Sequence, residues 1–429
     1  MKQPFLLCIL LSFTFLLLES NTILPLPFPT LQPTTSSTTT LDPKQLRALQ
    51  SLNFPTSIDP CSNPPSLKST ALCENGKPFQ HLVSLHLADC SNDVFLSFAA
   101  LKSLSTLRDL SFINCPATIA THFPSDLASN LQSFTCINSL RVLTGDMLSQ
   151  LQNVVNLTAS HVPINASGPS VIIDNLPSLS KLTISHANLE GFMPKSWHST
   201  ITQIDLSNNK LKGNIHPSIT DLENLVSLDL TANRLTGELP TSIGDLIALR
   251  NLSLSSNSLS GSIPESMISM PELEYIDLSS NQFNGTIPKF FNKLKRLKYL
   301  SLENNNFHGI MPFNQTFIAK LEVFKIGNNM NLCYDNSSFT PNVSLGIAPC
   351  DKNGVPVRPP MKAVPSGGDD EDDEGNDFED EGGGSEVKTS QKSSEQHGSN
   401  KAVLGLAIAV SSIAFLLIFL IFISKRFAS

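Results

Sequence analysis

Two tyrosines, Tyr275 and Tyr299, are the side chains of this sequence best suited to recognising another molecule. They lie 24 residues apart. The charged residues around them are Glu274, Asp277, Lys298, Glu303 and Lys325. Aromatic side chains bordered by charge are typical anchors of protein–protein interfaces. We therefore expect a contact surface for a peptide or protein at this place. The alternative is a pair of exposed tyrosines with ordinary solvated neighbours.

Two histidines, His161 and His186, recur in a similar way, and each follows a serine. Histidine titrates at mildly acidic pH, so such a pair could respond to the acidity of its surroundings. An exposed pair without a role is the simpler interpretation, and we favour it. No third ligand falls at the same spacing, so we expect no metal site, and nothing in the sequence indicates a cofactor.

The chain shows no sign of catalytic chemistry. Its formal charge is −8, but ten carboxylates lie between residues 369 and 381, and removing them leaves 27 acidic against 29 basic residues. The acidity is therefore a property of one segment, which argues against nucleic acid as a partner. That segment has no structure to hold carboxylates at a catalytic separation. Phosphate-binding, kinase, hydrolase and metalloprotease motifs are missing, so we expect no enzymatic activity.

A 24-residue repeat positions the tyrosines. Its blocks read L-x-x-L-x-L-x-x-N-x-L-x-G and most continue into Ile-Pro; they open at Ile201, Leu225, Leu249, Leu273 and Leu297. This pattern is the signature of leucine-rich repeats. The alternating leucines predict a short inner strand, and the Asn side chain satisfies backbone groups of neighbouring turns. One turn cannot bury its own apolar edge, so the turns must stack into a solenoid.

Weaker copies extend the array in both directions. They open at Leu82, Leu107, Leu131, Val154, Leu179 and Leu321. We therefore expect a curved α/β-type superhelix of about eleven repeats over residues 82–332, with parallel inner strands. Asp42 and Pro43 read as the start of a short helix, which predicts an N-terminal cap over residues 41–81. Residues 333–350 are the expected C-terminal cap.

Seven of the eight cysteines fall within the array or its two caps. Cys61 with Cys73, and Cys333 with Cys350, are close pairs at the two ends of the array, and we expect each pair to form a disulfide. Cys90 and Cys115 take the slot that Asn fills in later repeats, and Cys136 takes an inner-strand slot. We expect these three to be reduced and packed in the core. A disulfide between Cys90 and Cys115 is the alternative.

Two hydrophobic segments indicate the compartment. Residues 1–20 read as a secretory signal peptide and residues 402–423 as one transmembrane helix, followed by Lys425 and Arg426. A buried helix or a removed lipid-anchor signal is the alternative for the second segment. We expect a single-pass type I protein of the plasma membrane with an extracellular N-terminus. Residues 21–40 are a Pro/Thr/Ser-rich segment, residues 351–401 an acidic disordered stalk, and residues 424–429 the cytosolic tail.

Two kinds of surface feature follow from this topology. Small residues on one face of the expected span permit close approach of a second helix: Ala402, Gly405, Ala409 and Ser412. Asn-x-Ser/Thr sequences predict glycosylation at Asn156, Asn165, Asn251, Asn284, Asn314, Asn336 and Asn342. Glycans on the inner strands, at Asn156 and Asn251, would restrict access there and favour the surface around Tyr275 and Tyr299.

Taken together, these features resemble a plant leucine-rich-repeat receptor-like protein. The resemblance rests on the Leu-Ser-Gly-Ser-Ile-Pro half-repeat at 259–264, the cysteine-paired caps, the acidic stalk, the single span and the minimal tail. It implies a kinase-less receptor at the plasma membrane that borrows a leucine-rich-repeat receptor kinase as adaptor or co-receptor. The family's paired cap tryptophans are missing, since the only Trp is Trp197, and no island interrupts the last repeats.

From the resemblance we expect a receptor for an extracellular peptide or protein ligand, acting in plant defence. A developmental co-receptor that modulates peptide-receptor kinases is the first alternative. An adhesion or scaffold membrane protein without signalling is the second.

Overall fold

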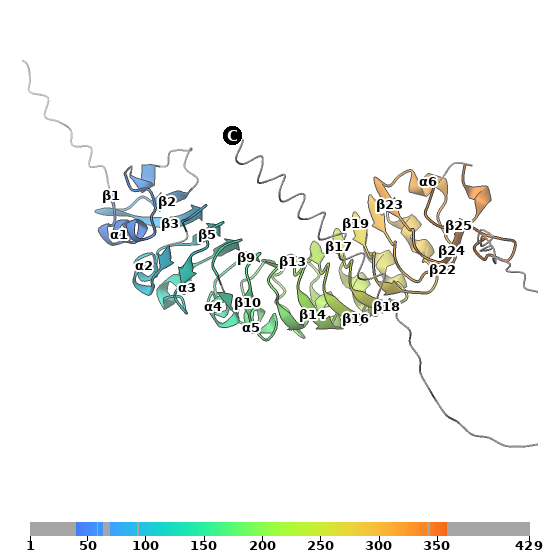
Figure 1. Cartoon of the computed structure of the whole chain (residues 1–429), viewed down its shortest axis with the longest axis horizontal. Helices are drawn as coiled ribbons and strands as arrows, with labels where there is room; N and C mark the ends of the chain where they lie inside the picture. Colours follow the sequence, from blue (N-terminus) through green and yellow to red (C-terminus); the bar gives the residue numbers. More distant parts are fainter. Residues whose placement is uncertain are drawn as a thin grey trace, which may run out of the picture. The chain divides into compact units, whose positions relative to one another are not determined.

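One parallel sheet runs along the whole array and receives one strand from each turn (Figure 1). The computed structural model describes residues 40–57, 59–62, 69–91, 94–141, 143–340 and 344–357. The expected signal peptide, most of the stalk, the membrane span with its small-residue face, the cytosolic tail and Asn342 lie outside these ranges. No helix within them is long and apolar enough to cross a membrane.

The inner sheet follows the repeat register of the sequence. After the first strand, each inner strand begins two residues after a predicted opening residue, as β19 does after Leu273. The strands pair in parallel from each turn to the next. They are β3 (Phe79–Ala88), β5 (Asp109–Ile113), β7 (Ser133–Ile137), β9 (Asn156–Ser160), β11 (Lys181–Ser185), β13 (Gln203–Asp205), β15 (Ser227–Asp229), β17 (Asn251–Ser253), β19 (Tyr275–Asp277), β21 (Tyr299–Ser301) and β23 (Val323–Lys325). The predicted leucine-rich-repeat solenoid with parallel inner strands is confirmed.

Short helical turns and small sheets form the rest of each coil. The early turns carry α2 (Phe98–Ser103), α3 (Ser125–Asn130), α4 (Gly145–Ser149) and α5 (Ser170–Ile173). Later turns carry 3-10 segments: η2 (Pro217–Asp221), η3 (Thr241–Asp245), η4 (Glu265–Ser269) and η5 (Lys289–Lys293), then the α-helix α6 (Gln315–Ile318). Short strands lie between the two sides: β4 (Phe95–Leu96), β6 (Thr118–Ile119), β8 (Leu143–Thr144), β10 (Ile164–Asn165), β12 (Glu190–Phe192), β14 (Lys210–Gly213), β16 (Arg234–Glu238), β18 (Ser258–Gly261) and β20 (Gln282–Phe283). Pro240, Pro264 and Pro288 each stand just before a 3-10 segment, where a missing N–H costs nothing.

In the later turns, from Asn209 on, asparagine side chains tie each turn to the one before it. The amide nitrogen of Asn281 donates to the carbonyl oxygens of Leu254 (3.0 Å) and Leu278 (3.2 Å), and its oxygen accepts from the N–H of Leu259 (3.0 Å). The same pattern recurs at Asn209, Asn233, Asn257, Asn305 and Asn329. This ladder satisfies backbone groups that the short strands leave unpaired in the core.

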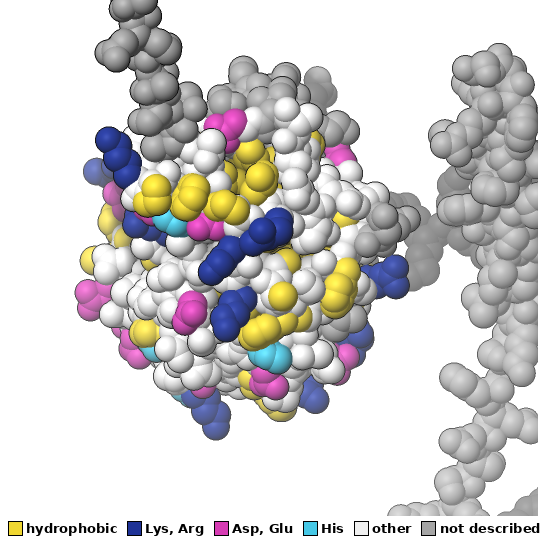
Figure 2. All heavy atoms as spheres, turned by 90° about the vertical axis from the view of Figure 1, so that its left-hand side faces the viewer, with side chains coloured by type: hydrophobic (Ala, Val, Ile, Leu, Met, Phe, Trp, Pro, Cys, Tyr) yellow, Lys and Arg dark blue, Asp and Glu magenta, His cyan; other side chains and the backbone are white. Residues whose placement is uncertain are grey.

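A helix and two extra strands close the N-terminal end. The Asp42 carboxylate accepts from the N–H groups of Lys44 (2.7 Å) and Gln45 (3.3 Å), which confirms the predicted start of α1 (Pro43–Ser51). The strands β1 (Thr40–Leu41) and β2 (Thr70–Glu74) flank β3, and η1 (Pro60–Ser62) precedes β2. Figure 2 looks onto this end, where Lys and Arg side chains lie between groups of hydrophobic side chains. At the other end, β22 (His308–Ile310), β24 (Asn331–Tyr334) and β25 (Ala348–Pro349) form a small sheet, and η6 (Asn336–Ser338) lies between β24 and β25 in the sequence.

The cysteines confirm three predictions and overturn one. Cys61–Cys73 and Cys333–Cys350 are disulfides, and Cys136 is a buried free thiol whose pKa burial raises to about 12. The expectation that Cys90 and Cys115 are reduced is wrong, because they form a disulfide with a Cα–Cα distance of 4.6 Å. The reason is geometric. Equal slots on adjacent parallel turns stand at about the separation that a disulfide spans.

Candidate functional site

Tyr275 and Tyr299 stack on the inner face of the sheet. They are register partners on β19 and β21, and their rings lie 4.1 Å apart between centroids with an interplanar angle of 18°. Both side chains are half-buried. The structure thus brings the two tyrosines together as the repeat spacing predicts, and their outer edges stay open to a partner.

The hydroxyl group of Tyr275 is tied to its own strand. It donates to Asp277 at 3.4 Å. Burial raises the pKa of Tyr275 well above its usual range, and the Asp277 carboxylate adds to the shift. The phenol therefore stays neutral over the physiological range and keeps its proton for this hydrogen bond.

The charges around the tyrosines are largely paired with one another. Lys298 reaches Glu274 at 3.2 Å, and Lys325 reaches Glu303 at 3.5 Å. Sequence reasoning missed a further group of ion pairs, in which Glu272 pairs with Arg296 at 2.6 Å and with Arg250 at 3.7 Å. The 24-residue spacing from Glu272 to Arg296 was a usable signal, because it places opposite charges on adjacent turns. Such exposed pairs contribute little stability, about 0–1 kcal/mol each, and remain available for exchange with a partner.

A second column on the same face is acidic. Asp205 and Asp229 are register partners, and Asp277 lies two strands further on. Burial raises the pKa of Asp229, although the hydrogen bond from the Thr231 N–H (2.9 Å) opposes the shift. The inner face therefore carries negative charge next to the tyrosines. Its sequence signal is the Asp in the same slot of three repeats, 24 and then 48 residues apart.

The sequon at Asn251 lies closer to the tyrosines than we expect from the sequence. Asn251 is the register partner of Tyr275, and its side chain is exposed. A glycan there would stand beside the tyrosine pair, so the expectation that it would favour this surface is wrong. The other described sequon asparagines are also exposed: Asn156, Asn165, Asn284, Asn314 and Asn336.

His161 and His186 also stack, with centroids 4.1 Å apart and an interplanar angle of 11°. Both are exposed and adopt left-handed backbone conformations, with φ of 56° and 51°. The Ser160 hydroxyl contacts the Nδ1 atom of His161 at 2.9 Å. Among the residues the structure describes, no cluster of three or more His, Cys, Asp or Glu side chains could hold a metal ion.

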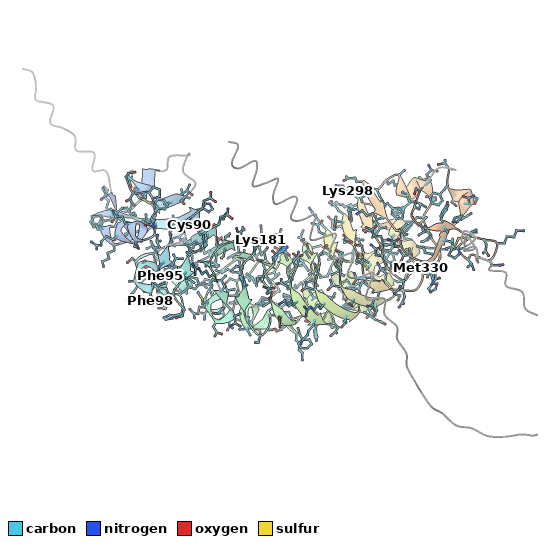
Figure 3. All side chains as sticks on the ribbon, in the orientation of Figure 1. Cys90, Phe95, Phe98, Lys181, Lys298 and Met330 are labelled. Atoms are coloured by element: carbon cyan, nitrogen blue, oxygen red, sulfur yellow. A yellow bond between two sulfur atoms is a disulfide. The ribbon has the colours of Figure 1, made fainter. Side chains whose placement is uncertain are left out.

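Figure 3 places Lys181 and Lys298 on the side lined by the inner sheet, and Phe95 and Phe98 on the opposite side. Phe98 packs against His122 with ring centroids 5.0 Å apart. Lys298 therefore lies on the inner face, and the exposed side chains Phe95 and Phe98 do not belong to that face.

Comparisons with known proteins agree with this architecture. Residues 223–283 and 200–222 match the leucine rich repeat family. The chain is 51% identical over 412 residues to Receptor-like protein 55 of Arabidopsis thaliana, which covers 92% of this chain and 94% of the relative. A plant ice-binding protein has a similar structure, with a TM-score of 0.53 and 20% identity over 68% of this chain and 96% of that one. The ectodomain of the Arabidopsis receptor kinase HAESA is similar at a TM-score of 0.41, with 26% identity over 60% of this chain and 51% of that one.

At its level of identity, the ice-binding protein shows only that the fold is shared. The relative from Arabidopsis shows more, because it matches nearly the whole chain at half of the positions. This chain belongs to the leucine-rich-repeat receptor-like proteins of plants.

Proposed function

We propose that this chain is a plasma-membrane receptor that recognises an extracellular ligand or a partner ectodomain and signals in plant defence through a leucine-rich-repeat receptor kinase. The observation that carries the proposal is the stacked pair of Tyr275 and Tyr299 on the inner face. Membership of the receptor-like family supports the same role.

The tyrosine pair has the properties of an interface anchor. Stacking limits the rotamers of each ring, so little side-chain entropy is lost when a partner covers them. The surrounding charges are paired already, so a partner does not have to neutralise isolated ions. Rigid aromatic side chains inside a polar border are the residues that most often dominate binding energy.

The output would pass through the membrane. The expected span at 402–423 presents Ala402, Gly405, Ala409 and Ser412 on one helical face, which would let a kinase's span approach closely. This segment lies outside the described residues, so the pairing stays a sequence-based proposal.

The test is proximity labelling from the full-length chain in plant plasma membranes. We expect the wild type to label receptor kinases and Tyr275→Ala/Tyr299→Ala to label them at least about tenfold less, since two anchors are lost. The matched control is Tyr275→Phe/Tyr299→Phe, which keeps both stacked rings and should retain most of the labelling. Kinase labelling by the alanine variant at the wild-type level would refute the tyrosine contact.

The same experiment separates the other functions. Recovery of wall or matrix proteins alone would point to adhesion or scaffolding instead of signalling. If receptor kinases are recovered, the phenotype of a loss-of-function line decides between defence and developmental patterning.

A further inference from the structure

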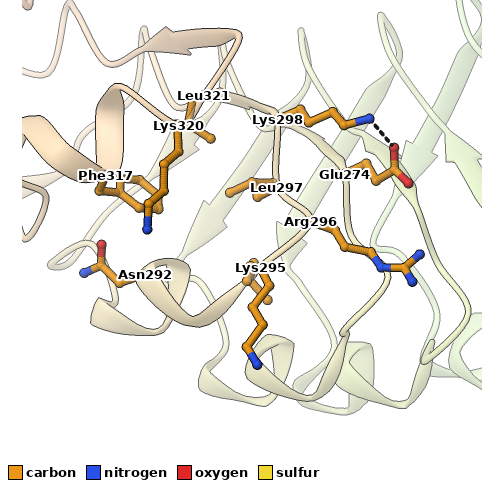
Figure 4. Close-up of a pocket in the computed structure, with 10 residues that line it drawn as sticks. Glu274, Asn292, Lys295, Arg296, Leu297, Lys298, Phe317, Lys320 and Leu321 are labelled. Carbon is orange, nitrogen blue, oxygen red and sulfur yellow. Dashed lines mark hydrogen bonds and ion pairs between the residues drawn. The ribbon is translucent and has the colours of Figure 1, made fainter.

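A groove opens on the flank of the array beside the tyrosine pair. It has a volume of about 660 Å³ and lies between the turn that carries η5 and the turn that carries α6 (Figure 4). Its position coincides with an offset of the outer helical segments, while the inner strands keep their 24-residue spacing. The 3-10 segments begin 24 residues apart from Pro217 to Lys289, but α6 begins 26 residues after Lys289. The two turns therefore do not stack as the earlier ones do.

The floor of the groove is apolar. Leu294 and Leu297 are 6% and 5% exposed, whereas their counterparts one turn earlier, Met270 and Leu273, are both 0% exposed, and Phe317 is 8% exposed. These side chains keep only a small exposed area, and Leu321 beside them is half-buried, so the four together form an apolar floor. A ligand side chain that covers them removes apolar surface from water, which favours binding.

The rim of the groove is basic. Its charged lining residues are Lys295, Arg296, Lys298, Lys320 and Glu274. Figure 4 shows Lys298 joined to Glu274, and Arg296 is held by Glu272. Lys295 and Lys320 are exposed and form no ion pair with any described residue. Two ammonium groups therefore stand free beside an apolar floor.

We propose that this groove binds an acidic peptide that carries a hydrophobic side chain. The carboxylates of the peptide would pair with Lys295 and Lys320, and its apolar side chain would cover Leu297 and Phe317. A carboxylated polysaccharide fits less well, because it would leave the apolar floor exposed. The groove shares Glu274 and Lys298 with the border of the tyrosine pair, so one ligand could touch both. The proposal deepens the proposed receptor function by naming its ligand class.

The test uses the purified full-length chain in lipid nanodiscs and a fluorescein-labelled short peptide in which Glu alternates with Leu and Phe. Fluorescence polarisation gives Kd. We expect Lys295→Glu/Lys320→Glu to weaken binding at least about tenfold, because two attractions become repulsions. The matched control is Lys289→Glu/Lys293→Glu, an equal charge change on exposed residues of the same turn that do not line the groove. It should change Kd by less than about twofold.

Variants of the probe test the two parts of the site separately. Replacing Glu by Gln, or Leu and Phe by Ser, should each weaken binding about tenfold, and added salt should weaken it further. Equal losses in both lysine double variants would overturn the proposal. Binding of an oligogalacturonate as tight as that of the peptide would also overturn it, in favour of a polysaccharide. Kinase labelling in membranes does not enter this measurement, so failure here and failure of the proposed receptor function are distinguishable.

Discussion

Asn281→Ala should destabilise the solenoid by an amount that can be worked out from the ladder. Among the described residues, Asn281 is the one whose side chain accepts from the N–H of Leu259, and Leu259 is fully buried. The two carbonyl groups that accept from Asn281 lose one hydrogen bond each, but each keeps a second donor. Leu254 keeps the amide of Asn257 at 3.1 Å, and Leu278 keeps that of Asn305 at 2.9 Å. One orphaned buried N–H costs about 1–3 kcal/mol, and the small void adds to it, so we expect a loss of about 2–4 kcal/mol.

The chain itself supplies a rescue variant. Ser139 stands in the ladder slot of an early repeat, and its hydroxyl group accepts from the N–H of Cys115 at 2.9 Å. Asn281→Ser keeps a hydroxyl group in the slot and should recover a small part of the stability that Asn281→Ala loses. The recovery is small because Ser139 accepts from the N–H 24 residues earlier, whereas Asn281 accepts from Leu259, 22 residues earlier. The matched control is Asn306→Ala, since Asn306 is exposed and its side chain makes no hydrogen bond with any described residue.

The assay is chemical denaturation followed by circular dichroism, together with hydrogen exchange of the segment that contains Leu259. Exchange is needed because a repeat array can open locally without global unfolding. We expect the midpoint order wild type, Asn306→Ala, Asn281→Ser, Asn281→Ala, with faster exchange only in the last two. If Asn281→Ala and Asn306→Ala had the same midpoint and the same exchange, the ladder would not be what ties these turns together.

Two further predictions concern the cysteines and the acidic column. Intact-mass measurement after alkylation under denaturing conditions should find Cys136 as the one free thiol of residues 40–357; three would mean that Cys90 and Cys115 are reduced. Cys115→Ser should lower the free energy of unfolding by about 3–4 kcal/mol, because the disulfide closes a loop with a sequence separation of 25 and so reduces the entropy of the unfolded chain. An unchanged denaturation midpoint would contradict this. Because burial raises the pKa of Asp229 in the fold, its stabilising contribution is present below the ordinary aspartate value of 3.8 and is lost as pH rises through the folded value. Asp229→Asn should therefore raise the thermal midpoint at pH 7 and lose that advantage near pH 3.8; equal gains at both pH values would refute the linkage.

The register of the inner strands could be predicted from the sequence because each repeat carries its own instructions. The spacing of the inner leucines places a strand, and the Asn three residues later ties it to the previous turn, as Asn209 and Asn233 do. Equal positions must then stack, which is why the contacts between Tyr275 and Tyr299 and between His161 and His186 follow from spacing alone.

Predictions failed where distance between turns mattered more than residue type. Cysteine is a common small apolar residue of cores, so Cys90 and Cys115 favoured a reduced state. Their Cα atoms lie 4.6 Å apart, which is close enough for the two sulfur atoms to form a disulfide. The register also implied that Asn251 lies beside Tyr275. That a glycan on Asn251 would stand next to the tyrosine pair is clear only from the pairing of their strands.

The sequence by itself determined the solenoid, its caps and the membership of the tyrosine pair in one column, because these depend on a period that repeats along the chain. Only the tertiary structure decided which charges are paired and where the groove lies. Ion pairs depend on side-chain reach between turns, as in the contact of Arg296 with Glu272. The groove above Leu297 depends on a two-residue slip between η5 and α6, which alters packing without breaking the repeat pattern.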